Sequence, residues 1–178
     1  MKLNIGCGKR NFGDKWIHID GANFSHIDSN DILLKLFKND SVDLIYSSHF
    51  IEYFDRNEII SLLKRWKKVL KKNGILRLAV PDFRVCADLY LKGMFPLENF
   101  LGPLYGKMKM GDKLIYHKTV FDFKSLKKIL ESIGMTHISI YDWRKTEHAK
   151  FDDHSQAYLP HFDKEEGTLI SLNVESKK

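Results

Sequence analysis

The clearest pattern of hydrophobic and polar positions lies between residues 42 and 80. The apolar run Val42–Tyr46 predicts a buried strand. Apolar residues then recur at helical spacing and predict a helix that begins at an Asp55 cap and is stopped by Asn73-Gly74. The apolar run 75–80 predicts a second buried strand. A strand–helix–strand unit of this kind predicts a parallel sheet.

The rest of the chain predicts further strands, one more helix and two long connections. The connections are rich in glycine and proline or in histidine and aspartate, which is typical of irregular binding loops. The strands are predicted at 3–5, 16–20, 138–141 and 168–174, with a weaker one at 24–27; the helix runs from an Asp122 cap to Gly134, and the connections span 88–118 and 145–167.

The composition fits one folded domain over residues 1–178. Hydrophobic residues make up 43% and charged residues 29%, which suits a globular α/β core. Cys7 and Cys86 have neither metal-binding nor disulfide spacing, and free thiols suit a reducing compartment. The chain shows no signal-peptide pattern and no apolar stretch near the roughly 20 residues of a membrane span. We therefore expect a cytoplasmic protein.

A glycine turn follows the first predicted strand and indicates a ligand site. In Gly6-Cys7-Gly8 the backbone N–H groups can approach a bound molecule without an intervening side chain. A dinucleotide fingerprint requires a third glycine, but Asn11 occupies that position. It also requires an acidic residue about 20 residues downstream, whereas Asp20 lies 12 residues after Gly8. Both differences disfavour nicotinamide and flavin cofactors.

A ligand without phosphates, such as S-adenosylmethionine, suits these residues better. Its amino-acid portion would meet the glycine turn, and its two ribose hydroxyls can both donate to one carboxylate, that of Asp20. Its adenine amino group needs an acceptor, which either Asp31 or Asp28 supplies, with Asp31 as the first candidate.

Several segments resemble class I S-adenosylmethionine-dependent methyltransferases, closest to a small bacterial subgroup of predicted methyltransferases. The resemblance implies an enzyme with an α/β fold: a Rossmann-like methyltransferase sheet, mostly parallel, with an antiparallel final strand. It also implies S-adenosylmethionine as the cofactor. The segments that carry it are 3–20 with the glycine turn, Ser41–Glu52, Val69–Leu78, Pro81-Asp82 and Ser171–Val174.

The resemblance also implies a role for individual residues. At the strand ends, where α/β folds bind ligands, the segment 47–49 would lie beside the sulfonium. The cofactor-binding residues are then Gly6, Cys7 and Gly8 at the methionine portion, Asp20 at the ribose, Asp31 at the adenine edge, and Ser47 and His49 beside the sulfonium.

The chain departs from the family pattern at two places. Tyr53 follows Glu52 where the family often has histidine. Only seven residues, Lys9–Lys15, separate Gly8 from the second strand, whereas a crossover connection needs about a dozen or more. We therefore predict an abbreviated first half, in which the first helix is shortened or replaced by a loop. The cofactor site would be more open than usual, closed by the substrate or a partner subunit.

Methyl transfer depends on positioning, and it needs a base only if the acceptor must lose a proton. His49 is the first candidate for that base because it follows a strand end near the predicted methyl group, and Asp82 and His117 are further candidates. The sequence after the strand is Ser-Ser-His-Phe rather than Asn-Pro-Pro-Tyr. That difference disfavours methyltransferases that act on DNA adenine or protein glutamine.

No metal site is predicted. Histidines and aspartates gather in the second long connection, but their spacing matches no familiar ligand pattern, and a polar surface loop is the preferred interpretation. The residues concerned are His148, Asp152, Asp153, His154, His161 and Asp163.

The leading functional hypothesis is methylation of a small molecule or a carbohydrate; the resemblance suggests a surface-glycan pathway. The net charge of +6 supports an alternative, an RNA or protein methyltransferase. Many of the lysines lie on predicted amphipathic helices, however, so nucleic acid is not the expected partner. A third hypothesis is a non-catalytic module that binds the cofactor. A homodimer is a further expectation.

Overall fold

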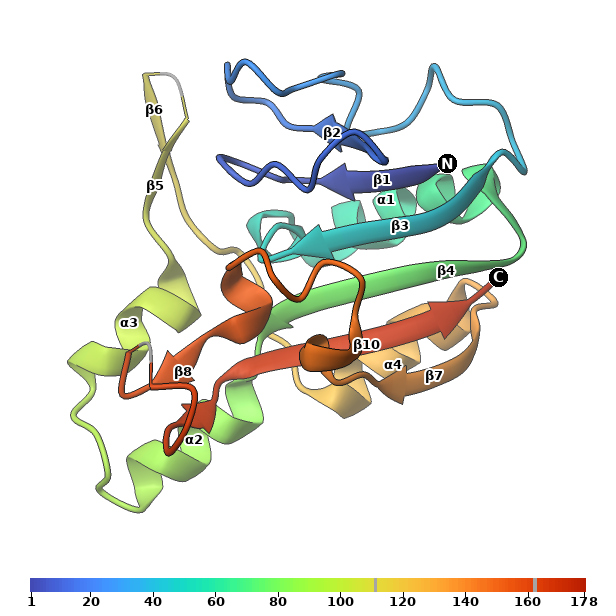
Figure 1. Cartoon of the computed structure of the whole chain (residues 1–178). Helices are drawn as coiled ribbons and strands as arrows, with labels where there is room; N and C mark the ends of the chain where they lie inside the picture. The colour runs from blue at the N-terminus through green and yellow to red at the C-terminus, as the bar shows by residue number, and fades with distance from the viewer. Residues whose placement is uncertain (111, 162) are drawn as a thin grey trace.

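The computed structural model of the chain describes residues 1–110, 112–161 and 163–178; Gly111 and Phe162, which lie in the two long connections, are outside the described residues. A six-stranded sheet forms the centre of the molecule (Figure 1). Its strands, in spatial order, are β2 (Trp16–Ile19), β1 (Lys2–Ile5), β3 (Val42–Ser48), β4 (Leu70–Pro81), β10 (Ser171–Lys177) and β7 (Thr136–Ile140).

The directions of the strands confirm the predicted fold class. Strands β2, β1, β3 and β4 are parallel to one another, and β10 is antiparallel to both β4 and β7. The last strand of the chain is therefore the antiparallel one. This is a Rossmann-like methyltransferase sheet, in which parallel strands bring their carboxyl ends to one edge.

Two helices cover one face of the sheet, behind it in Figure 1. Helix α1 (Arg56–Val69) begins with the predicted capping box between Asp55 and Glu58, and α4 (Phe123–Ser132) begins at the predicted Asp122 cap. Their apolar sides close the main hydrophobic core against the strands. The buried residues of α1 are Ile59, Leu62, Leu63, Trp66 and Val69.

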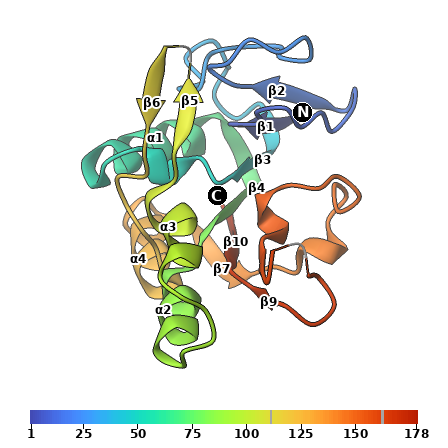
Figure 2. The same ribbon diagram turned by 90° about the vertical axis from the view of Figure 1, so that its left-hand side faces the viewer.

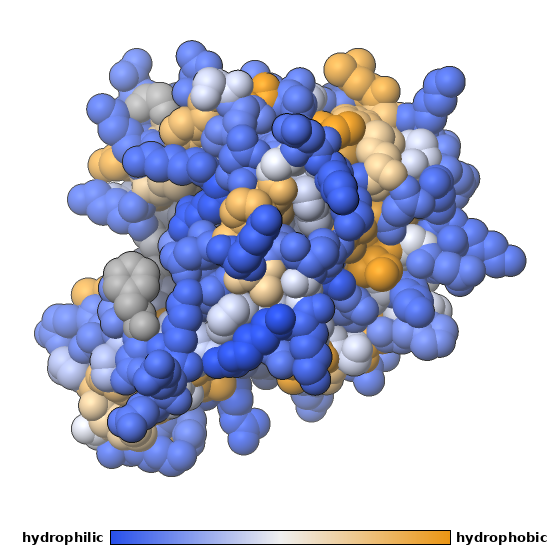
Figure 3. Space-filling model, viewed as in Figure 1, coloured by the Kyte–Doolittle hydropathy of each residue, from blue (hydrophilic) through white to orange (hydrophobic). Residues whose placement is uncertain are grey.

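A segment without α-helix, residues 141–157, covers the opposite face. Its buried His148 stacks on Phe12, with ring centroids 4.9 Å apart. Arg77 of β4 pairs with Glu147 at 3.1 Å, and Tyr46 of β3 donates to Asp153 at 2.5 Å. The segment lies in front of the sheet in Figure 1, and that face is largely hydrophilic on the outside in Figure 3. Its aromatic and histidine side chains therefore form a second, smaller core.

The first half is abbreviated, as predicted. Residues 6–15 between β1 and β2 contain no helix, and neither do residues 20–41 between β2 and β3. The weak strand predicted at 24–27 is wrong: these residues form turns, and a single bridge joins Ile19 to Ser29 instead. The link 6–15 is too short for a crossover helix, and the link 20–41 forms turns instead of one. The segment 141–157 covers the face that such helices would cover.

The predicted helix stop at Asn73-Gly74 is also misplaced. Helix α1 ends at Val69, and β4 begins at once with Leu70. Asn73 has a φ of 63°, and the pairing of β3 with β4 shifts register between Val42 and Leu44. The turn residues therefore produce an irregularity inside a strand rather than the end of a helix.

The two long connections are more ordered than predicted. The first contains the end of α2 (Phe83–Leu91), then α3 (Glu98–Tyr105) and a hairpin of β5 (Met108–Met110) and β6 (Lys113–Ile115). Short elements lie in and beside the second connection. They are the 3₁₀ turns η2 (Trp143–Lys145) and η3 (His154–Gln156), and the strand pair β8 (Tyr158–Leu159) and β9 (Thr168–Leu169). The predicted strand at 168–174 is divided between β9 and β10.

Figure 2 shows where the two long connections lie relative to the sheet. The hairpin and α3 stand on one side of the sheet edge, and the second connection stands on the other. Both lie at the carboxyl ends of the parallel strands. In the part of the chain that the structure describes, no helix is long and apolar enough to cross a membrane.

Candidate functional site

A cavity of about 1150 Å³ opens at the carboxyl edge of the sheet, between the two connections. Its volume lies slightly above the range typical of small-molecule sites, which is roughly 300–1,000 Å³. The predicted site residues that line it are Gly6, Cys7, Gly8, Asp20, His49 and His117. The structure therefore brings six of the nine predicted residues together.

The glycine turn shapes the floor of the cavity by its backbone conformation. Gly6 and Gly8 have φ values of 70° and 53°, a region that favours glycine. The N–H of Gly6 donates to the carbonyl of Ile19 at 2.8 Å, and the N–H of Gly8 donates to Asp20 at 2.7 Å. These two amides are bonded within the protein, so the turn offers space and close approach rather than free N–H groups.

Asp20, at the end of β2, retains acceptor capacity toward the cavity. Its Oδ2 accepts from the N–H of Gly8 and its Oδ1 from the N–H of Ala22, at 2.7 and 2.8 Å. An ionised carboxylate can accept about four hydrogen bonds, so two positions remain. Two adjacent hydroxyl donors, such as those of a ribose, would fill them.

Two residues that line the cavity each hold a buried polar atom with no hydrogen-bond partner among the described residues. They are Nδ2 of Asn4 and Oγ of Ser48, from neighbouring strands β1 and β3. Buried polar groups are almost always bonded, and each unpaired one costs roughly 1–3 kcal/mol. Atoms of this kind on a cavity wall indicate a polar ligand that completes their bonding.

His49 and His117 lie on the cavity wall, and a buried acid lies behind both. Oε1 of Glu52 is 3.7 Å from Nδ1 of His49 and 3.9 Å from Nε2 of His117. Within the described part of the chain, both oxygens of Glu52 lack a hydrogen-bond partner, and burial raises the pKa of this carboxyl to about 8. Burial also lowers the pKa of His117 and lowers that of His49 well below its ordinary value. All three groups are therefore neutral near pH 7.

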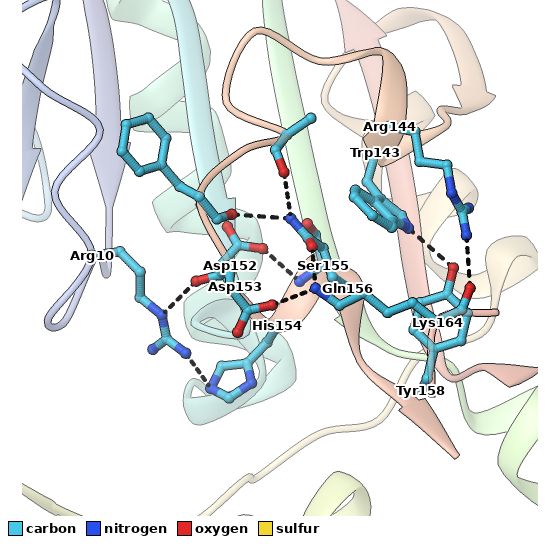
Figure 4. A network of polar contacts seen from close by, with 12 residues as sticks. Arg10, Trp143, Arg144, Asp152, Asp153, His154, Ser155, Gln156, Tyr158 and Lys164 are labelled. Carbon is cyan, nitrogen blue, oxygen red and sulfur yellow. Dashed lines mark hydrogen bonds and ion pairs between the residues drawn. The ribbon is translucent and has the colours of Figure 1, made fainter. Parts of the chain in front are cut away.

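A basic side chain closes the cavity toward the second connection. Arg10, from the loop after the glycine turn, reaches the carbonyl of Asp152 at 3.4 Å and Nε2 of His154 at 3.5 Å (Figure 4). Lys164 holds Asp152 and Gln156, both at 2.7 Å. The hydrogen bonds of Arg10 thus attach the loop that replaces the first helix to the second long connection.

Three of the predicted site residues do not line the cavity. Ser47 is buried beneath it and donates to the carbonyl of Ile5 at 2.9 Å. Asp31 accepts from the N–H of Leu36 at 2.6 Å. Asp82 caps α2 by accepting from two backbone N–H groups. Each of these side chains has a structural partner, and Asp28, the alternative to Asp31, accepts from the N–H of His18.

The histidines and aspartates of the second connection separate into different environments. His148 is buried in the aromatic cluster, whereas His154 lines the cavity. Among residues 1–110, 112–161 and 163–178, no group of three or more histidine, cysteine or acidic side chains could hold a metal ion.

Sequence reasoning missed Asn4 and Glu52 as site residues. Asn4 carries a signal, because it is a polar residue inside the apolar strand β1. Glu52 carries none: its importance depends on His117, which is 65 positions away and reaches it only because the first long connection folds back.

Two comparisons with known proteins bear on this site. Residues 9–78 match a family described as "Methyltransferase domain". That match contains Asp20, His49 and Glu52 and ends within β4. A sequence search of curated proteins finds no match.

Several solved structures with a similar fold are methyltransferases. A SAM-dependent methyltransferase from Archaeoglobus fulgidus has a TM-score of 0.58 at 17% identity, over 99% of this chain and 85% of that one. One from Thermotoga maritima has a TM-score of 0.61 at 13% identity, over 99% and 81%. The Burkholderia thailandensis 1,6-didemethyltoxoflavin-N1-methyltransferase, solved with S-adenosylhomocysteine, has 0.56 at 12%, over 99% and 70%.

The match over residues 9–78, which is less than half of the chain, and the shared fold agree with each other. The chain has the class I fold of S-adenosylmethionine-dependent methyltransferases, and its first half matches a methyltransferase domain. The predicted resemblance to S-adenosylmethionine-dependent methyltransferases is thereby confirmed for the fold, and the match over residues 9–78 is consistent with it.

Proposed function

We propose that this protein transfers a methyl group from S-adenosylmethionine to a small molecule bound in the same cavity. The observation that carries the proposal is the wall formed by the glycine turn, Asp20 and the unpartnered atoms of Asn4 and Ser48. S-adenosylmethionine, an amino acid joined to a nucleoside, suits this wall because it presents a carboxylate, two ribose hydroxyls and no phosphate.

The residues present fit this cofactor. Asp20 would accept from the ribose hydroxyls, and the Asn4 amide and the Ser48 hydroxyl would donate to polar groups of the ligand. The turn 6–8 would accommodate the methionine portion. Asp31, with Asp28 as the alternative, stays the predicted acceptor for the adenine amino group, and Ser47 would support the wall from beneath.

Catalysis would depend first on positioning. The bound cofactor supplies an already activated methyl group, so the chain must orient an acceptor and, where needed, remove its proton. His49 and His117 lie on the cavity wall and stay the first candidates for that base. Asp82 lies outside the cavity and is the weaker candidate.

Several features support a small acceptor, and a carbohydrate of a surface-glycan pathway remains the suggested example. The cavity is framed by the hairpin on one side and the second connection on the other, which favours a compact molecule over a polymer. Its basic lining residues favour the alternative of RNA, whose binding would weaken steeply with salt. Those residues are Lys9, Arg10, Lys107, Lys109 and Lys118.

Isothermal titration with S-adenosylmethionine and S-adenosylhomocysteine tests the cofactor. Saturable binding is expected, and no heat at millimolar ligand would overturn the proposal. Labelled cofactor incubated with fractionated small molecules, RNA and protein then identifies the acceptor class. Label in the small-molecule fraction is expected, whereas label only in RNA or protein would support the alternative. A protein that binds the cofactor without any transfer would be a non-catalytic module.

Asp20→Asn is expected to weaken cofactor binding by about 10- to 100-fold, because a hydrogen bond to a charged group contributes roughly 1.5–3 kcal/mol. The amide keeps the size of the side chain but replaces one acceptor oxygen with a donor. Titration calorimetry measures the change, and Asp88→Asn, at an exposed position of α2, is the matched control. Equal affinities of Asp20→Asn and wild type would contradict the assignment. Asp31→Asn and Asp28→Asn, measured alongside, decide which of these acids reaches the adenine.

A further inference from the structure

Glu52 is a buried acid that the proposed chemistry does not yet use. Its side chain is 1% exposed and is not part of the cavity wall. It lies between the two cavity histidines, and both approach the same oxygen, Oε1. A carboxyl group in such a position either carries a proton or leaves an uncompensated charge in the interior.

The hydrogen-bond network around His49 indicates which of its ring nitrogens carries the proton. Asn173 donates through Nδ2 to the carbonyl of Ser155 at 2.9 Å, so its Oδ1 faces Ser171. Ser171 donates its hydroxyl proton to that Oδ1 at 3.0 Å. The Ser171 oxygen can then only accept from Nε2 of His49, which is 3.3 Å away. The proton of neutral His49 is therefore on Nε2, and Nδ1 presents a lone pair to Glu52.

His117 presents a lone pair to the same place. Its Nδ1 is 3.1 Å from the carbonyl of Pro103, which only accepts, so Nδ1 carries the proton. Nε2 then faces Glu52 without one. Gly106 leaves room for the His117 ring, because a side chain at position 106 would collide with it. Two lone pairs thus face one carboxyl oxygen, at 3.7 and 3.9 Å, an arrangement that suits a protonated Glu52 and disfavours its carboxylate.

We propose that Glu52 is a positioning residue that controls which nitrogen of His49 carries the proton, and thereby whether His49 can act as a base toward the cavity. This inference rests on the proposed function only for its catalytic consequence. The proton arrangement itself is a property of the protein without cofactor.

The two states of the cluster differ by one proton. In the neutral state, Glu52 is an acid and His49 carries its proton on Nε2. When the cluster loses one proton to solvent, Glu52 becomes a carboxylate and attracts the remaining proton of His49 to Nδ1. Nε2 of His49 then carries a lone pair and no longer donates to Ser171. This is the tautomer control that a buried carboxylate exerts on a histidine base.

The transfer step then balances. A lone pair of the acceptor forms the bond to the methyl carbon, and the carbon–sulfur bond breaks with its electron pair going to sulfur. The acceptor's proton passes to Nε2 of His49, which must exchange its contact with Ser171 for one with the acceptor, and the Glu52 carboxylate balances the charge of the resulting imidazolium.

Few charged groups surround this cluster from other elements. Lys118 donates its backbone N–H to the Glu52 carbonyl, while its ammonium group pairs with Glu58 at 3.4 Å. The remaining titratable groups that face the three side chains are Tyr53, whose ring packs on His117, and His154 and Arg10 beyond His49.

The first test follows the protons directly, by nitrogen-15 NMR of the protein without cofactor between pH 6 and 9.5. In the wild type, His49 is expected to change from the Nε2–H to the Nδ1–H form as Glu52 ionises, with a midpoint near the Glu52 pKa of about 8. In Glu52→Gln, the amide donates to Nδ1, so His49 keeps the Nε2–H form at every pH. A wild-type His49 that never changes form, or a variant that changes like the wild type, would overturn the proposal.

A second measurement does not depend on any variant. The carbon-13 signal of the Glu52 carboxyl should titrate between pH 7 and 9, and a midpoint below pH 5 would overturn the proposal. Glu131→Gln, at an exposed position of α4, serves as the matched control for a lost carboxylate.

The third test uses methyl transfer. Glu52→Gln should lower kcat about 100-fold, the lower end of the effect of a general base, with KM and cofactor affinity unchanged. The rise of kcat with pH should disappear, and Glu52→Asp should restore part of it. An unchanged pH profile would overturn the proposal. Absence of cofactor binding in the wild type would overturn the proposed function instead, and the NMR result would still decide the proton arrangement.

Discussion

Gly6→Ala is expected to destabilise the protein by about 3 kcal/mol, from roughly 1 kcal/mol of backbone strain and 1–3 kcal/mol of overpacking. Gly6 has a φ of 70°, which disfavours any other residue. An added Cβ would also lie 2.7 Å from Cβ of Phe50. Phe50 cannot move aside easily, because its ring packs between Phe54 and Trp66 of the main core.

Gly8→Ala is the matched control for this prediction. Gly8 has a similar φ of 53°, but the nearest atom to an added Cβ is Nη1 of Arg10, at 4.0 Å. The control should therefore show only the strain of about 1 kcal/mol. Urea unfolding of the two variants separates strain from collision. Equal losses of stability would show that Phe50 does not define the space above the glycine turn.

The main core and the parallel unit follow from local signals. The Asp55–Glu58 capping box and the helical spacing of Leu62 and Trp66 predicted α1 because these features act within a few residues of one another. The same holds for the glycine turn and for Asp20, which a short link brings to the same edge of the sheet. The shortness of that link also predicted the missing first helix.

The cover of the opposite sheet face was not predictable in the same way. Residues 145–167 look like a polar surface loop because they are rich in histidine and aspartate. In the structure, Asp153 accepts from Tyr46 and His148 is 1% exposed. The Tyr46–Asp153 contact joins residues 107 positions apart, and no periodicity in the sequence reports it or the burial of His148. The site depends on this packing, since His154 reaches the cavity from the same segment.

The cluster around Glu52 shows a similar limit. A sequence pattern locates His49 at a strand end, but it does not show that an acid three residues later turns inward. Nor does it show that His117 returns to that acid after α2, α3 and the hairpin. Candidate bases were therefore predictable as residues, whereas the group that sets their protonation was not.

His148 makes the second core sensitive to acid. Neither of its ring nitrogens has a hydrogen-bond partner in residues 1–110, 112–161 and 163–178, and burial lowers its pKa from 6.5 to about 4. The unfolded chain takes up a proton near pH 6.5, whereas folded His148 resists protonation until about pH 4. Stability is therefore lost as the pH falls between these values, because the unfolded state binds more protons. The loss amounts to about 3 kcal/mol at 1.36 kcal/mol per pKa unit.

His148→Phe is expected to remove this loss. A phenyl ring can stack on Phe12 as the imidazole does, at a similar size and without a buried unpaired nitrogen. Urea unfolding at pH 7 and at pH 4.5 should show that the variant loses about 2–3 kcal/mol less than the wild type over that interval. His137→Asn, at an exposed position, is the control and should lose as much as the wild type. The same pH dependence in His148→Phe and wild type would show that His148 is protonated without disturbing the fold.

The consequence for the site follows from the position of His148. The segment 141–157 is held to the sheet by this ring, by the Tyr46–Asp153 hydrogen bond and by the Arg77–Glu147 ion pair. Protonation of His148 places a charge between Phe12 and Tyr46, so the segment should detach before the main core unfolds. Cofactor binding of the wild type should then weaken below pH 5 while α1 and the sheet persist. In His148→Phe, binding should hold to lower pH, as calorimetry and far-ultraviolet circular dichroism on the same samples would show.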